Sequence, residues 1–207
     1  MTGGRAALAL WVDVDPADHA QFEHWHSREH AQERVGCPGW LRGSRFKGVD
    51  LPGRYLLFYD AETLDAFESE EYYARLRDPT EMSRAIFPKF RETWRTACKV
   101  EQRWGEGIGA AVLTLRMKAA NTAPFEKLAA LETARVDLLI GQPNIGQANI
   151  GQAHTTEKDL RASPDRQIEC ALVAFFWSVD AARAARARHA PEGEIFALRH
   201  TVSKGDL

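Results

Sequence analysis

The 207-residue sequence predicts an α+β fold built from two tandem ferredoxin-like units, each with the order strand, helix, strand, strand, helix, strand. Three observations predict it. The same succession of apolar runs and helical patterns occurs twice, turn residues separate the elements, and a glycine-rich stretch at residues 105–109 lies between the copies. We therefore expect one unit over residues 1–105 and a second over residues 106–207.

In the first copy, the apolar run at residues 6–13 has the length of a strand and ends before an Asp-Pro pair. Asp15 can cap a helix that begins at Pro16 and continues to about Val35. The other elements expected in this copy are strands at residues 40–49, 54–60 and 96–104 and a proline-divided helical stretch at residues 63–94.

The second copy repeats this order with one insertion. Its predicted elements are strands at residues 110–118, 135–140, 169–179 and 194–203 and helices that begin near Thr122 and Asp180. Residues 140–154 hold three tandem pentapeptides, IGQPN, IGQAN and IGQAH, where the first copy has only a short turn. Because Gly, Gln and Asn cannot build an apolar core, we expect an expanded surface loop there and assign it no chemistry.

The composition of the sequence argues against nucleic-acid and membrane partners. Lys and Arg number 27 against 29 Asp and Glu, so the sequence lacks the basic excess that nucleic-acid binding needs. No apolar run reaches the roughly 18 residues that span a bilayer, and the first residues lack a secretory pattern. We expect a cytoplasmic protein without nucleic-acid or membrane partners. The widely spaced Cys37, Cys98 and Cys170 predict free thiols.

Ionisable residues are concentrated on the first predicted helix. At about 100° per residue, the aromatic and the His/Glu side chains share an arc of about 140°, while Arg34 lies on another face. The residues on this arc are Phe22, Trp25, His26, Glu29, His30 and Glu33. Polar groups on a buried face cost free energy unless they are hydrogen bonded. The pattern therefore predicts either a paired cluster or the wall of a solvated cavity.

The segment His26-Ser27-Arg28-Glu29-His30 also matches the pattern H-x-x-E-H. In that pattern two histidines one helical turn apart bind zinc and the glutamate acts as a base. The motif is short, and no third ligand is identifiable in the sequence. A zinc-dependent hydrolase using His26, Glu29 and His30 is thus the least favoured alternative, and we expect no metal and no cofactor.

A longer pattern extends beyond this helix. The residues Trp25, Glu29-His30, Glu33-Arg34, Pro38-Gly39-Trp40 and Arg45-Phe46 follow one another in the order W-(Y or H)-x-x-E-H-x-x-E-R and P-G-(F or W)-x-x-x-x-R-(Y or F). This pattern resembles that of small bacterial proteins in the dimeric α/β-barrel superfamily. The superfamily includes EthD-like proteins, antibiotic-biosynthesis monooxygenases, polyketide cyclases and muconolactone isomerases. The resemblance covers residues 6 to about 104.

The resemblance implies that two ferredoxin-like antiparallel sheets pack face to face as an α/β barrel. Such barrels normally form from two chains, and here one chain could supply both halves. We therefore expect either a monomer with an internal pseudo-dimer or a homodimer. On this architecture the first helix and the neighbouring strands bound a cleft for a small-molecule ligand.

Within that cleft, His26 or His30 could act as general base or acid, with Glu29 as the partner that orients it. The residues expected to bind the ligand are Trp25, Glu33, Arg42, Arg45, Tyr55 and Tyr59. The sequence thus predicts a small-molecule-binding protein capable of cofactor-free proton transfer on a carbonyl or phenolic compound, of cyclase, isomerase or monooxygenase type.

The alternative is a noncatalytic binding or stress-associated protein in which the same side chains hold the fold together. A pocket of roughly several hundred Å³ with His30 exposed into it would favour the enzyme. A solid, fully paired cluster would favour the structural role.

Overall fold

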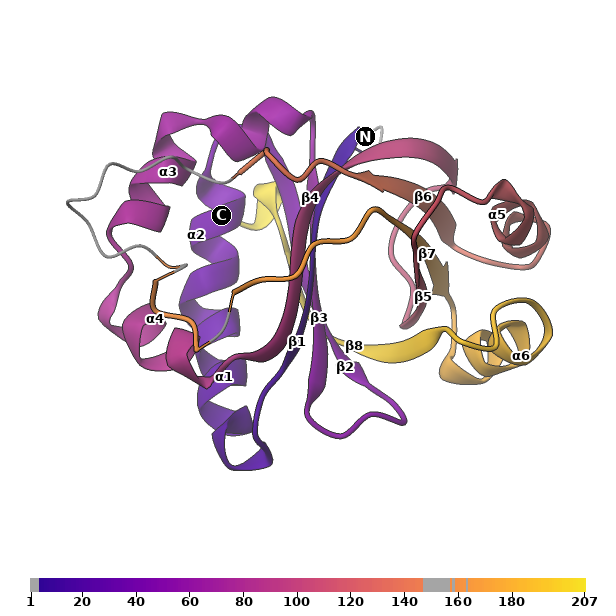
Figure 1. Cartoon of the computed structure of the whole chain (residues 1–207), viewed down its shortest axis with the longest axis horizontal. Helices are drawn as coiled ribbons and strands as arrows, with labels where there is room; N and C mark the ends of the chain where they lie inside the picture. The colour runs from indigo at the N-terminus through magenta and orange to yellow at the C-terminus, as the bar shows by residue number, and fades with distance from the viewer. Residues whose placement is uncertain (1–3, 147–156, 158, 163) are drawn as a thin grey trace.

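The eight strands of the computed structural model close into one antiparallel barrel with the order β1-β3-β2-β8-β5-β7-β6-β4 (Figure 1). The structure describes residues 4–146, 157, 159–162 and 164–207. The strands are β1 (Ala6–Asp13), β2 (Trp40–Gly48), β3 (Arg54–Ala61), β4 (Arg91–Gly105), β5 (Ala111–Met117), β6 (Arg135–Gly141), β7 (Cys170–Phe176) and β8 (Glu194–Ser203). The helices are α1 (His19–Trp25), α2 (Ala31–Gly36), α3 (Glu70–Arg77), α4 (Glu81–Ile86), α5 (Thr122–Ala129) and α6 (Val179–His189).

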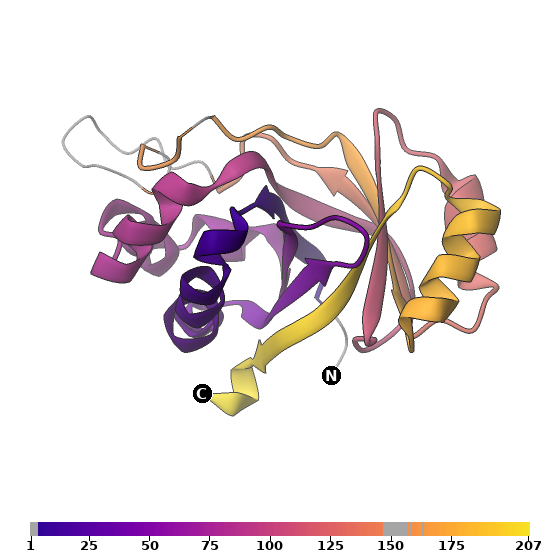
Figure 2. The same ribbon diagram turned by 90° about the horizontal axis from the view of Figure 1, so that it is seen from below.

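Each half of the chain supplies four adjacent strands, in the order β4-β1-β3-β2 and then β8-β5-β7-β6. The halves join where β2 pairs with β8 and β4 pairs with β6. Helices α1 to α4 cover the sheet of the first half, and α5 and α6 cover that of the second (Figures 1 and 2). Beyond β8, the Lys204 ammonium donates to the carbonyl oxygens of Val35 and Gly36 at 3.0 and 2.9 Å. The end of the second half is thereby fixed to α2.

The interior of the barrel is filled by its own side chains. Along each strand, alternate residues point inward. The largest of these are Trp11, Phe46, Phe58, Phe175 and Phe196, packed among small residues such as Ala7 and Ala171. The Trp11 indole N–H donates to the Thr114 hydroxyl at 3.1 Å across the interior. The interior of the barrel is therefore part of the hydrophobic core.

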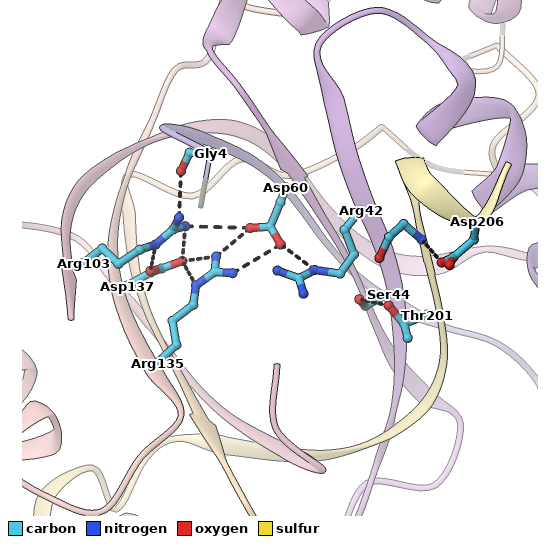
Figure 3. Close-up of polar contacts among 10 residues, drawn as sticks. Gly4, Arg42, Ser44, Asp60, Arg103, Arg135, Asp137, Thr201 and Asp206 are labelled. Carbon is cyan, nitrogen blue, oxygen red and sulfur yellow. Dashed lines mark hydrogen bonds and ion pairs between the residues drawn. The ribbon is translucent and has the colours of Figure 1, made fainter. Parts of the chain in front are cut away.

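A buried ion network closes one end of the barrel (Figure 3). Arg135 on β6 donates to Asp60 on β3 at 2.6 Å and also to Asp137. Arg103 on β4 donates to Asp137 at 2.7 Å, and Arg42 on β2 donates to Asp60 at 3.2 Å. Burial raises the pKa of Asp60, but the adjacent Arg135 outweighs it and holds that pKa below its usual value. The network therefore joins the two halves through paired charges.

Ion pairs also close the opposite end. Arg54 pairs with Asp13 at 2.7 Å and with Glu194 at 2.9 Å, and Arg116 pairs with Glu194 at 3.0 Å. The Arg116 guanidinium lies over the Trp94 ring, 4.9 Å from its centroid. Since Arg54 and Glu194 belong to different halves of the chain, this end too is held together by contacts between the halves.

The element boundaries differ from the predicted ones in one important place. The helical stretch expected to reach residue 94 ends at Lys89, and β4 begins at Arg91. Pairing of β4 with β1 through Trp11 and Trp94 overrides the helical spacing of the aromatic residues. In the insertion, β6 ends at Gly141, and most of the pentapeptide repeat, residues 147–154, lies outside the described residues.

Two simpler predictions can also be compared with the structure. Cys37, Cys98 and Cys170 are free and buried, as the sequence indicated. Among the residues that the structure describes, no helix is both long and apolar enough to cross a membrane.

The ion network between β3 and β6 predicts a large effect on stability. Arg135→Met should lower the free energy of unfolding by about 3–5 kcal/mol, because it leaves buried carboxylates without their central partner. Urea unfolding followed by circular dichroism measures the change. Asp50→Asn, which removes an exposed partner of Arg183 and Arg186, should leave the midpoint nearly unchanged. Equal effects of the two substitutions would contradict this role of the network.

Candidate functional site

A π-helical turn at His26–His30 separates α1 from α2 within the first helix. A π turn holds one extra residue, which rotates the face presented by all later residues by about 100°. Arg34 is consequently buried, with 2% of its surface exposed, although regular helical spacing predicted that it would lie on another face. Such turns occur frequently at functional sites.

The helix and the outer face of the first sheet enclose a small cavity. Its apolar wall consists of Leu8, Leu10, Trp25, Leu57, Phe87 and Phe90. Its polar lining consists of His30, Arg34, Tyr59, Tyr72, Arg95, Glu157 and Arg161. The cavity measures about 20 Å³, which is room for one water molecule.

His30 is a buried, neutral member of this lining. Its ring stacks on the Trp25 ring with centroids 4.2 Å apart, and 7% of its surface is exposed. Burial, and then the charge of Arg34, hold its pKa well below 6.5. Its Nδ1 atom has no hydrogen-bond partner. A neutral imidazole has one unprotonated ring nitrogen, which can accept a proton.

His26 occupies a different environment, one turn earlier. It is fully buried, and its Nε2 lies 3.1 Å from the Tyr59 hydroxyl. Burial, Arg45 and His200 lower its pKa well below 6.5, and burial raises the pKa of Tyr59. The His26 and His30 ring centroids are 6.1 Å apart. His26 thus contacts the hydroxyl group of Tyr59, which is a residue of the cavity lining.

The second half contributes to this cluster. The ring centroid of His200, on β8, lies 6.0 Å from that of His26. The pairing of β8 with β2 places His200 opposite Arg45. Only the closure of the barrel brings these residues together, so no local pattern could have indicated it.

In the described structure, Glu29 and Glu33 do not bond to the histidines. Glu29 accepts hydrogen bonds from Thr80 and Ser83 at the start of α4. Trp25 donates to the same Ser83 hydroxyl at 2.9 Å. Glu33 lies 3.7 Å from Arg75, and burial raises its pKa despite the nearby Arg34. These bonds attach the helix to α3 and α4.

The predicted binding residues on the strands are also distributed among separate contacts. Arg45 donates to the Glu23 carbonyl at 2.6 Å and to the Ser27 hydroxyl at 3.0 Å. Tyr55 donates to the Glu23 carboxylate at 2.7 Å. Arg42 belongs to the ion network inside the barrel. Of the predicted ligand-binding set, Trp25 and Tyr59 line the cavity.

Several cavity residues were not predicted from the sequence. Arg34 pairs with Glu157, Arg95 donates to the Tyr72 hydroxyl, and Arg161 pairs with Asp165. Arg34 does stand in the E-R pair of the sequence pattern, which is the one signal that pointed to it. The others come from β4, α3 and the segment after the insertion, and only tertiary packing brings them to one place.

The zinc alternative gains no third ligand from the fold. Among the residues with described placement, no three His, Cys, Asp or Glu side chains are grouped so that they could hold a metal ion. Tyr59 already engages Nε2 of His26.

Comparisons with solved structures show the class of fold. The chain is similar to an anthrone oxidase-like protein, with a TM-score of 0.61 and 13% identity over 98% of this chain and 95% of that one. It is similar to a "putative monooxygenase" from Fusobacterium nucleatum subsp. nucleatum, with a TM-score of 0.56 and 11% identity over 100% and 98% of the two chains. A third, a "putative monooxygenase" from Lactobacillus acidophilus, has a TM-score of 0.54 and 6% identity over 97% of each chain.

These likenesses indicate a mixed α/β barrel of the dimeric α/β-barrel type, and at such low identity they concern the fold alone. No family model matches the sequence, and no curated protein matches it significantly.

The two buried histidines predict a specific pH dependence of stability. Below about pH 6.5 the unfolded chain takes up protons that native His26 and His30 do not. The free energy of unfolding should therefore fall as pH decreases from 7 to 5, with a slope that approaches about 1.4 kcal/mol per pH unit for each histidine below about pH 6. Urea titrations at several pH values measure this slope.

The variant His26→Gln/His30→Gln should lose most of the slope. His24→Gln, which alters an exposed histidine of the same helix, should retain it. A double variant with the native slope would show that other groups control the acid sensitivity.

Proposed function

We propose that this chain is a cytoplasmic small-molecule-binding protein that catalyses cofactor-free proton transfer on a carbonyl or phenolic compound in the cavity beside His30. We also propose that residues 1–105 and 106–207 are tandem ferredoxin-like units that form an intrachain version of the dimeric α/β barrel. The strand orders β4-β1-β3-β2 and β8-β5-β7-β6 support this assignment, because both follow one pattern. We expect a monomer or a homodimer.

One observation carries the catalytic proposal: a buried, neutral imidazole without a partner on Nδ1 lies in a cavity lined by arginines. In the proposed step, His30 accepts a proton from a carbon that is beside the carbonyl of the ligand or, as in anthrone, conjugated with it through an aromatic ring. The C–H electron pair becomes the enolate, whose negative charge resides mainly on oxygen. Arg34 and Arg95 can stabilise that oxygen because their guanidinium groups are already oriented in a site with little water.

The fate of the enolate decides the overall reaction. Reprotonation at another atom gives isomerisation, attack on a second carbonyl of the same molecule gives cyclisation, and addition of dioxygen gives oxygenation. In each case the enolate itself supplies the electron pair, so the proposal needs no cofactor. The names of the similar structures, an anthrone oxidase-like protein and two monooxygenases, favour oxygenation.

A noncatalytic role is the second candidate. A cavity of about 20 Å³ is smaller than a ligand pocket, and the Glu157 side chain contributes to its lining. The bonds of Glu29, Arg45 and Tyr55 also fasten the helix in place. Against a purely structural role, Nδ1 of His30 and of His26 and Nη1 of Arg34 are buried without partners, so the cluster is not fully paired.

The proposed proton transfer can be measured with anthrone as a probe. In D₂O, the wild-type protein should accelerate the replacement of the acidic carbon-bound protons of anthrone by deuterium. Proton NMR measures the rate at which the signal of these protons is lost. His30→Gln should reduce this acceleration by about 10²- to 10⁴-fold, the usual contribution of a general base. An oxygen electrode would then show whether the enolate is oxidised.

His24→Gln provides the matched control, since His24 is an exposed histidine on the same helix. It should keep the full rate. Parallel losses of melting temperature and exchange rate in His30→Gln would instead support the structural role. No acceleration by the wild-type protein would remove anthrone-like compounds from the proposed substrates.

A further inference from the structure

Three arginines and one carboxylate, that of Glu157, line the cavity. Arg34 and Arg161 are nearly fully buried, with 3% and 5% of their side chains exposed, and Arg95 is half-buried. Glu157 and Asp165 are the acidic groups paired with them. Glu157 and Asp165 thus balance two of the three guanidinium charges. A guanidinium group that is buried without an anion is costly, so the position of the Glu157 carboxylate favours an anionic occupant.

The same arginines have unused hydrogen-bond donors. Nη1 of Arg34 and Nε of Arg161 are buried, and neither has an acceptor. Each buried donor without a partner costs about 1–3 kcal/mol. Arginine presents its donors in a planar fork that suits the two oxygens of a carboxylate. The site therefore lacks acceptors, which an anionic ligand would bring.

The contacts of Glu157 show that a carboxylate fits beside Arg34 and Arg161. Its carboxylate pairs with Nη2 of Arg34 and lies 3.9 Å from Nη2 of Arg161, so one carboxylate reaches both guanidinium groups. The Glu157 amide is held by the Leu76 carbonyl at 3.1 Å. The Glu157 side chain thus reaches the arginines from a loop. It does not belong to the sheet or the helices that enclose the cavity.

The remainder of the cavity is aromatic. Trp25 packs edge-to-face against Phe87, with centroids 5.5 Å apart, and against Phe90, with centroids 6.0 Å apart. Arg161 lies over the Phe87 ring at 5.5 Å from the centroid. Rings that meet edge to face at this spacing favour another aromatic ring as their neighbour.

We propose that the cavity beside His30 binds an aromatic monocarboxylate, whose carboxylate replaces that of Glu157 on Arg34 and Arg161 while its ring packs against Trp25 and Phe87. The Glu157 side chain then competes with the ligand for Arg34 and Arg161. When the ligand displaces it, the space that the side chain leaves accommodates the ligand. This inference rests on the proposed function only in taking the cavity as the ligand site, and it requires no proton transfer.

Calorimetric titration with benzoate tests the proposal directly, with benzamide as a neutral analogue of the same size and acetate as a carboxylate without a ring. Benzoate should bind about tenfold or more tightly than either analogue. Glu157→Gln should strengthen benzoate binding by about tenfold, because the competing charge is removed.

Arg34→Met should abolish benzoate binding, and Arg34→Lys should restore part of it because the charge returns without the fork. Arg183→Met, at an exposed arginine on α6, is the matched control and should bind like the wild type. Circular dichroism establishes whether each variant is folded. If Arg34→Met does not fold, Arg34→Lys takes its place in the comparison.

Equal affinity for benzoate and benzamide would overturn the proposal, as would the absence of benzoate binding by both the wild type and Glu157→Gln. Binding by Glu157→Gln alone would support it, since competition would then be complete. If benzoate binds but His30→Gln leaves anthrone exchange unchanged, the proposed catalysis fails while the anion site stands.

Discussion

The structure depends on the filling of the barrel by its own side chains and on the pairing of the charges at its ends. Arg135 could not be buried without Asp60 and Asp137, and these three residues join β3 of the first half to β6 of the second. The aromatic interior and the end networks occupy the barrel, and the cavity beside His30, the proposed ligand site, lies outside it under the first helix.

Two local features then shape that site. The π turn directs Arg34 inward beside His30, and burial keeps the imidazole neutral while the guanidinium retains its charge. A neutral base and a cation can therefore act together at neutral pH. His26 and Tyr59 support the arrangement through one hydrogen bond. The chemistry would need both the irregular helix and the surrounding apolar walls.

Much of the architecture could be predicted from the sequence, because apolar periodicity and turn residues are local signals. The predicted order of strands and helices and the strand at 194–203 agree with the structure. The inward position of Trp25, His26 and His30 agrees as well. The position of Arg34 could not be predicted, since a π turn depends on packing against the sheet. The meeting of Arg95 with Arg161 is a long-range contact, and strand pairing with β1 decided where β4 begins.

The two sides of the barrel differ in the side chains that lie between sheet and helices. Helices α5 and α6 cover the second sheet with an apolar cluster built around Phe125, Leu128 and Phe176, whereas the equivalent space in the first half holds the histidines and arginines. In a barrel made of two identical chains, every substitution appears twice. A single chain is free of that symmetry, so the costly buried polar groups of the proposed site can lie on one side of the barrel while the other side stays apolar. His200, on β8, is the residue of the second half that reaches His26 in this cluster.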